Sequence, residues 1–483
     1  MSEVALRTAK DASVESPNSK KELLRYWLVF LACLGLICFR GWDRLIHAEL
    51  FAEDTMFVEE AFNHGWLSLF ILYDFFAHTV PRIIAVLSVK VVPIEHLPFF
   101  TNFVCYLLTA AAMANVSRTC YRWLIPSDAA RIGFCLIVVC APGLYEFLGN
   151  ITGIHWALLF WLATLCLKDL EESFTVWELM LLALIVVTVG AAIVFVGIAF
   201  VRLIFAWNSA RTSNRRHLSN TQVQREAIFF GMLLLVSTFL VLNFILQDAR
   251  VGGDGSGRDI VKGMRSLGDL LIALGNLFVG FFVLHPFLGT HHTSVFLKVT
   301  PFYPLLVVCI LLMGILFWRL KGELDQKLWL ILAWLVCIFL IAVMLSFLRY
   351  WTFYGVFKAP YWDWWFRYNF IFAVAGVLLW FILMRPKKLV SFSDWTSVVI
   401  LVLIVSYVSQ ANTMLKGAVS SHSTDRFAID RYGEAIWPEA AKEIRRSMET
   451  GCPKKVIFKA YPRRQWVLEY HTTVTGQDCS KEQ

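Results

Sequence analysis

Four carboxylates lie close together in "LFAEDTMFVEEAFNHGWLSLF", residues 50–70: Glu53, Asp54, Glu59 and Glu60. Apolar and aromatic side chains are interleaved with them, and the stretch follows the first long apolar run of the chain. A water-facing loop would carry such acids without cost, whereas acids beside a membrane segment are otherwise expensive unless they are paired or functional. A positioned carboxylate can take the proton of an attacking hydroxyl group, so the first acid pair is a candidate for general-base chemistry.

A second group of polar side chains follows in "YDFFAHTVPRIIAVL". Asp74, His78 and Arg82 are spaced four residues apart, which would place them on one face of a single helix. Pro81 suits a first helical turn, so we expect an extended approach and then a helix that begins near this residue. A lone histidine in such a place commonly has no role, but the nearby arginine and acid pair make His78 a candidate substrate-binding residue.

The composition is that of a membrane protein. Of 483 residues, 58% are hydrophobic and only 17% are charged, and the mean hydropathy is +0.62. Apolar runs long enough to cross about 30 Å of hydrocarbon as a helix recur along the chain. The sequence therefore predicts an all-α polytopic membrane protein with amphipathic interfacial helices. The net charge of +8 is spread over loops, where it bears on which side of the membrane each loop faces. This distribution favours contact with anionic membrane lipids over binding to nucleic acid.

The number of spans depends on two ambiguous apolar stretches, 81–92 and 270–288. Without them we count eleven transmembrane helices, and with both of them thirteen. Basic loops favour the cytoplasmic side. The three basic loops, 117–131, 208–225 and 384–388, share one side only if neither stretch makes a net crossing, so we favour eleven.

The amino-terminal segment predicts the orientation of the chain. The first apolar run, 26–39, follows Lys20, Lys21 and Arg25. Signal peptides share this order, but no small-residue cleavage site follows. We therefore expect an uncleaved first helix in the cell (inner) membrane, a cytoplasmic amino terminus and an extracytoplasmic carboxyl-terminal tail.

The chain divides by composition into three parts: a cytoplasmic tail (1–24), a transmembrane domain (25–411) whose first outward loop holds interfacial helices at 40–94, and an extracytoplasmic domain (412–483). In the last part "WPEAAKEIRRSM" predicts a helix, and "KKVIFKAYP" and "QWVLEYHTTV" predict strands, so we expect a small α+β appendage. In an oxidising compartment Cys452 and Cys479 would form a disulfide; the alternative is two free thiols. No cysteine spacing is typical of a metal site.

The order of these motifs resembles the GT-C class of integral-membrane glycosyltransferases. Bacterial members of unassigned specificity carry AED, HGW, a tyrosine-rich approach, a histidine and Pro-Arg in the order found here, and "LYEFLGNITGIHWALL" is similar to their second outward motif. The resemblance implies inverting transfer of a sugar from a polyprenyl-phosphate donor to a glycan, lipid or protein acceptor outside the membrane. We expect no cofactor and no metal site.

The resemblance also implies roles for individual residues. Asp54 would be the base, with Glu53 as the alternative, because the class places its essential acid in this loop. Arg367 in "DWWFRYNF" would hold the donor phosphate, with Arg82 as a second candidate. An interfacial arginine that extends to lipid headgroups is an equally common arrangement. Substrate-binding candidates besides His78 are Asn150, His155 and Tyr368.

A transporter or flippase of a lipid-linked or anionic solute is the rival hypothesis. Such proteins usually show internal repeats and ionisable residues in the middle of the membrane. The sequence has no evident repeat, and its acids cluster outside the long apolar runs. The pattern therefore favours the enzyme.

Overall fold

The computed structural model describes most of the chain: residues 17–50, 54–72, 77–141, 144, 148–212, 216–250, 275, 278–288, 306–311, 313–315, 317–318, 327–348, 366–385, 398–406 and 436–450. These residues are overwhelmingly helical, and they include no strand. The all-α prediction is confirmed for this part of the chain.

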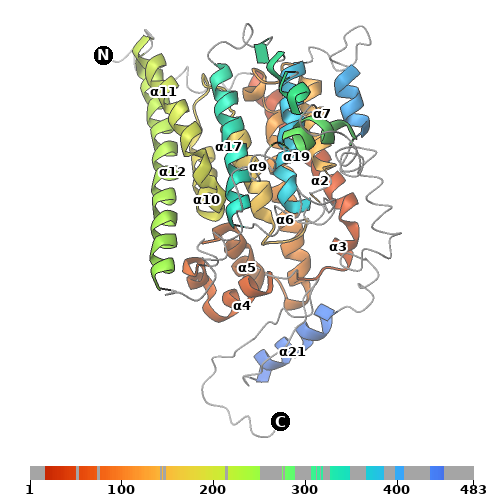
Figure 1. The fold of residues 1–483 in the computed structure, drawn as a ribbon. Coiled ribbons are helices and arrows are strands. Elements are labelled where there is room, and N and C mark those ends of the chain that lie inside the picture. The colour runs from red at the N-terminus through yellow and green to blue at the C-terminus, as the bar shows by residue number, and fades with distance from the viewer. Residues whose placement is uncertain are drawn as a thin grey trace, which may run out of the picture.

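Figure 1 shows the helices labelled and coloured in the order of the chain. Those used below are α2 (Pro17–Arg40), α3 (Trp42–Ile46), α4 (Asp54–His64), α5 (Thr79–Val91), α6 (Leu97–Ala114), α7 (Asp128–Val139), α9 (Ile154–Leu165), α10 (Val176–Thr188), α11 (Val196–Thr212), α12 (Arg216–Arg250), α17 (Lys327–Leu348), α19 (Phe366–Met384) and α21 (Ile436–Thr450). Short 3₁₀ segments include η1 (Gly65–Phe70), η2 (Ile94–His96) and η5 (Gly190–Phe195), and η6 (Phe278–Leu284) is a π-helix.

Five helical segments in the described residues are long and apolar enough to cross a membrane: Lys20–Arg40, Ile94–Ser117, Gly190–Arg211, Asn220–Asn243 and Lys327–Met344. Shorter apolar helices accompany them, among them Ile154–Leu165, Val176–Thr188 and Phe370–Met384. The chain is thus a membrane protein, while the predicted eleven or thirteen spans are not confirmed.

The long helices leave large apolar side chains uncovered. On α2, α12 and α17 respectively, Leu28 is 58% exposed, Leu235 73% and Trp329 66%. Apolar surface repeated along neighbouring helices is unusual for a protein in water and is what a surrounding hydrocarbon layer would cover. This distribution agrees with the membrane class.

Several predicted boundaries differ from the observed ones. Helix α2 begins at Pro17, inside the predicted 1–24 tail, and the predicted 208–225 loop is mostly helical because α11 ends at Thr212 and α12 begins at Arg216. Polar residues can continue a helix beyond the membrane surface, so hydropathy alone does not show where a helix ends. Helix α7 likewise ends at Val139, inside the apolar run 132–147 that we counted as one of the eleven spans.

Two short helices, α4 and α5, pack against each other at one end of the bundle (Figure 1). Helix α5 has 13 residues and lies beside α4 at this end rather than along the length of the bundle (Figure 1). Its start is tied to the end of α10, because the Val80 amide donates to Thr188 Oγ1 over 3.1 Å. This geometry supports the prediction that the stretch 81–92 makes no crossing.

The carboxyl-terminal helix α21 docks at the same end. Trp437 is buried, and its indole Nε1 donates to the Ile94 carbonyl over 2.9 Å. The exposed pair Arg445–Glu95, at 2.5 Å, joins the two segments a second time. The predicted tail helix is confirmed, whereas the predicted strands and the cysteines Cys452 and Cys479 lie outside the described residues.

Candidate functional site

The first residue of α4, Asp54, connects the two outward motifs of the sequence. Its side chain is buried (1% exposed), and its Oδ2 accepts a hydrogen bond from the Ile151 amide over 3.1 Å. Its Oδ1 accepts two more, from the Thr152 amide over 2.9 Å and the Thr152 hydroxyl over 2.8 Å. Three donors converging on one carboxylate match an ionised acid. The acid-pair motif and the "GNITGIHW" motif therefore form one local structure.

The turn that binds Asp54 is also supported from the other side. Arg44 Nη1 donates to the Leu148 carbonyl over 2.6 Å, and the Asn102 amide nitrogen donates to the Arg44 carbonyl over 2.9 Å. Gly149 has φ +72°, and a Cβ there would lie 3.1 Å from Asn102 Cγ. Glycine is needed at this position because both the backbone angle and the space disfavour a side chain.

The predicted sugar-binding residues Asn150 and His155 belong to this turn. Asn150 is buried, and its Oδ1 accepts a hydrogen bond from the Gly153 amide over 2.8 Å. His155 is half-buried, with Nδ1 close to the Thr152 carbonyl and its ring 4.9 Å from that of Trp156. Both side chains therefore help to shape the start of α9.

Arg82, predicted to bind the donor phosphate, is fully buried between α4 and α5. Its Nη1 forms an ion pair with Glu60, and its Nε donates to the Ala77 carbonyl over 3.0 Å. Its guanidinium carbon lies 5.1 Å from the centroid of the Phe57 ring. Buried Nη2 has no hydrogen-bond partner in the described part of the chain. Glu60, one of the four carboxylates of the first motif, is only 23% exposed and neutralises Arg82.

His78 lies beside this pair in an unusual backbone conformation. It precedes α5 with φ 46°, is 9% exposed, and its ring centroid is 5.5 Å from that of Phe57. A non-glycine residue in the left-handed region costs about 1–3 kcal/mol, and such residues are enriched at functional sites. Helix α5 begins at Thr79, directly after His78, which agrees with the expected helix start near Pro81, so His78 and Arg82 do not share one helix face. Asp74 lies outside the described residues.

Arg367 and Tyr368 are in the first turn of α19, where the structure describes the backbone but not these side chains. One turn later, Phe370 packs against Phe160 of α9 with 6.4 Å between ring centroids. Toward the other end of α19, Phe381 packs against Phe134 in the middle of α7. Glu53 lies outside the described residues.

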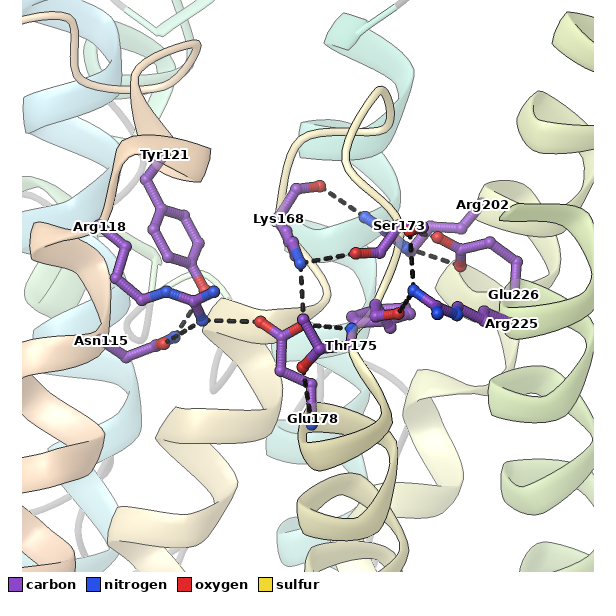
Figure 2. A network of polar contacts seen from close by, with 11 residues as sticks. Asn115, Arg118, Tyr121, Lys168, Ser173, Thr175, Glu178, Arg202, Arg225 and Glu226 are labelled. Carbon is purple, nitrogen blue, oxygen red and sulfur yellow. Dashed lines mark hydrogen bonds and ion pairs between the residues drawn. The ribbon is translucent and has the colours of Figure 1, made fainter. Parts of the chain in front are cut away.

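The sequence analysis did not identify a buried ionic network at the opposite end of α10 (Figure 2). Glu178 binds Arg118 over 2.7 Å and Lys168 over 2.8 Å, and it also accepts the Thr175 amide over 2.7 Å. In the same view Arg202 donates two hydrogen bonds to the Glu226 carboxylate, over 3.0 and 2.6 Å.

A signal for this network was present in the sequence. Arg202 is the single charge in the apolar run 191–207, and an isolated charge in such a run needs a partner or a function. Its Nη1 also donates to the carbonyls of Cys166 and Lys168, over 3.1 and 2.6 Å. The network thus holds the connection between α9 and α10 against α11 and α12.

No protein-family model, curated protein or solved structure matches this chain. Within the described residues, no group of three or more histidine, cysteine, aspartate or glutamate side chains is arranged to hold a metal ion. The acids and arginines around α4 and α5 are therefore the basis for a functional proposal.

Proposed function

We propose that this protein is a membrane glycosyltransferase that moves a sugar from a polyprenyl-phosphate donor to an extracytoplasmic acceptor. The observation that carries the proposal is the junction of Asp54 with Thr152. It joins an acid-pair motif to a second polar motif, next to two short helices that pack together at one end of the bundle (Figure 1). A carboxylate at the surface of a membrane domain is where an acceptor from water would meet a lipid-linked donor.

The two acids have different roles in this proposal. Asp54 is buried and engaged by three donors, so it is a positioning residue that fixes the start of α4. Glu53, the preceding residue, is the general base. This assignment exchanges the roles that the resemblance to the GT-C class implied, because the Asp54 carboxylate is buried and its contacts hold it away from an acceptor hydroxyl.

The reaction is a single displacement. The base takes the proton of the acceptor hydroxyl while that oxygen forms a bond to the anomeric carbon. The bond from this carbon to the phosphate oxygen breaks, and polyprenyl phosphate leaves with the electron pair. The configuration at the anomeric carbon is therefore inverted. Arg367 holds the leaving phosphate, where negative charge grows. Arg82 contributes only its Nη2, since its other nitrogens already bind Ala77 and Glu60.

We further propose that this site faces outward from the cell (inner) membrane, with eleven spans, a cytoplasmic amino terminus and an extracytoplasmic α21. The packing of α5 beside α4 at one end of the bundle supports the lower span count (Figure 1). Cationic residues gathered at the opposite end of α10, including Arg118, Lys168 and Arg202, support a cytoplasmic position for that end.

A transporter or flippase is the second candidate. The observation in its favour is the fully buried pair Arg202–Glu226, because ionisable residues inside a helical bundle often serve ion or substrate pathways. This pair is bidentate and also holds backbone carbonyls, which suits a structural role equally well.

One experiment separates the two candidates. The purified protein is reconstituted in liposomes and incubated with a panel of polyprenyl-phosphate sugars and candidate acceptors. Release of polyprenyl phosphate, lost in Glu53→Gln, is the result expected of the transferase. Movement of an intact lipid-linked sugar between leaflets without cleavage would support the transporter instead.

A further inference from the structure

Three guanidinium groups converge on one carboxylate where α2 meets α7. Arg25 Nη1 lies 2.7 Å from Asp128 Oδ2, and Arg122 Nη2 lies 3.5 Å from the same oxygen. Arg131 contacts the other oxygen of Asp128 from a fully buried position, and it also donates to the Ile125 carbonyl over 2.7 Å. One negative charge is therefore shared by three positive ones.

The neighbouring acid balances only part of this excess. Glu22 is attracted electrostatically by Arg118 and Arg25, while its Oε1 accepts hydrogen bonds from the amide and hydroxyl of Thr119. The other nearby carboxylate, Glu178, is bound by Arg118 and Lys168. The Asp128 cluster thus keeps a net positive charge and can accept a further anion.

Arg25 has unused donors within this cluster. Its Nε and Nη2 are both buried, and neither has a hydrogen-bond partner among the residues that the structure describes. Arg122 is 58% exposed and makes one long contact, so its remaining donors face solvent. Buried unpaired donors of a guanidinium are costly and therefore indicate an absent acceptor. A phosphate group suits such donors, since guanidinium groups bind it with strong charge-assisted hydrogen bonds.

An apolar surface begins beside this cluster. On α2, Leu24, Leu28 and Leu31 are 61%, 58% and 57% exposed, and the helix is one of the candidate membrane spans. At about 1.5 Å per residue, Leu28 and Leu31 lie roughly 5 and 9 Å from Arg25 along the helix axis. A soluble anion would use the arginines alone, whereas a phospholipid would use both the arginines and this surface.

We propose that Arg25 and Arg122 bind the phosphodiester of an anionic phospholipid whose acyl chains lie along the exposed face of α2. The site is at the opposite end of the bundle from Asp54, and the proposal does not depend on the glycosyltransferase activity. A zwitterionic headgroup brings its own positive charge to this cationic cluster, so net anionic charge on the lipid is the recognised property.

Native mass spectrometry of the full-length protein in a non-ionic detergent tests the site. Phosphatidylglycerol and phosphatidylcholine are titrated separately, with and without inorganic phosphate as a competitor. We expect phosphatidylglycerol to bind more tightly, and the Arg25→Gln/Arg122→Gln double variant to bind it about tenfold more weakly. Arg211→Gln is the matched control, because Arg211 is an exposed cation on α11 that packs over Trp207.

A variant that is expected to bind the lipid more tightly distinguishes loss of the site from misfolding. Asp128→Asn removes the competing carboxylate, so it should tighten phosphatidylglycerol binding, a result that loss of structure cannot produce. Equal weakening in the control, unchanged binding in the double variant, or no tightening in Asp128→Asn would overturn the proposal. Full displacement by inorganic phosphate would also overturn it, because the acyl chains would then contribute nothing.

Discussion

Thr152 donates two hydrogen bonds to the carboxylate of Asp54, although the two residues are 98 positions apart in the chain. One bond comes from the backbone amide and one from the hydroxyl, at 2.9 and 2.8 Å. The carboxylate thereby fixes the start of α4 against the turn before α9. In the proposed enzyme this contact fixes the residue that directly follows Glu53 in the sequence.

Replacing Thr152 by valine should test this contact with a small change. Thr152→Val removes the hydroxyl donor but keeps the amide, while Thr152→Ser keeps both donors. A hydrogen bond to a charged group contributes about 1.5–3 kcal/mol, so we expect turnover to fall by about tenfold or more in Thr152→Val. Turnover is measured on a defined donor at matched protein levels. Equal activity of the valine and serine variants would show that the hydroxyl is dispensable.

The ion pair between Glu60 and Arg82 should contribute to both thermal stability and donor binding. Glu60→Gln leaves a fully buried guanidinium without its counter-charge, so we expect a lower melting temperature and weaker donor binding. Glu59→Gln, one position earlier on α4, removes the same charge without breaking the Arg82 ion pair. Thermal unfolding in detergent and donor titration measure the two effects. Indistinguishable behaviour of the two variants would mean that the pair has no special role.

How far the sequence predicts this structure depends on the kind of interaction. The membrane class, the tail helix at 436–450 and the shortness of α5 follow from hydropathy, helix signals and charge, which are local properties. The pairing of Arg82 with Glu60 was not predicted, because helical periodicity indicates which face of α4 is polar but not which helix packs against it. The Asp54–Thr152 contact depends in the same way on tertiary packing.

The buried pair Arg202–Glu226 should show the energetic pattern of an ion pair within a bundle. Removing one partner leaves an uncompensated buried charge, so Arg202→Met should destabilise the protein by about 3–5 kcal/mol. The double variant Arg202→Met/Glu226→Met should recover much of this loss, because neither charge remains. Denaturant unfolding in mixed micelles measures both. A double variant as unstable as the sum of the two single variants would contradict this interpretation.

Asp128 should give the protein a measurable acid dependence. Burial alone would raise the pKa of its carboxyl, but the guanidinium groups of Arg131, Arg25 and Arg122 hold the pKa below its ordinary value. On acidification the unfolded state therefore takes up the proton first, and the stability contributed by Asp128, present at neutral pH, is lost as pH falls below about 4. The melting temperature of the wild type should thus exceed that of Asp128→Asn at neutral pH and approach it in acid. A difference that does not change with pH would contradict the ion-pair geometry.

The most direct test of the central claim is the turnover of Glu53→Gln and Asp54→Asn on a defined polyprenyl-phosphate sugar across a range of pH. Loss of a positioned base typically lowers the rate about 10²–10⁴-fold, so Glu53→Gln should fall in this range and lose the acid limb of the pH–rate profile. Asp54→Asn should also be slow but should keep that limb, because it displaces the base without removing it. Protein levels, checked by blot, should be unchanged in both. Full turnover in both variants would contradict the account and leave Asp54 as a structural link between α4 and the turn before α9.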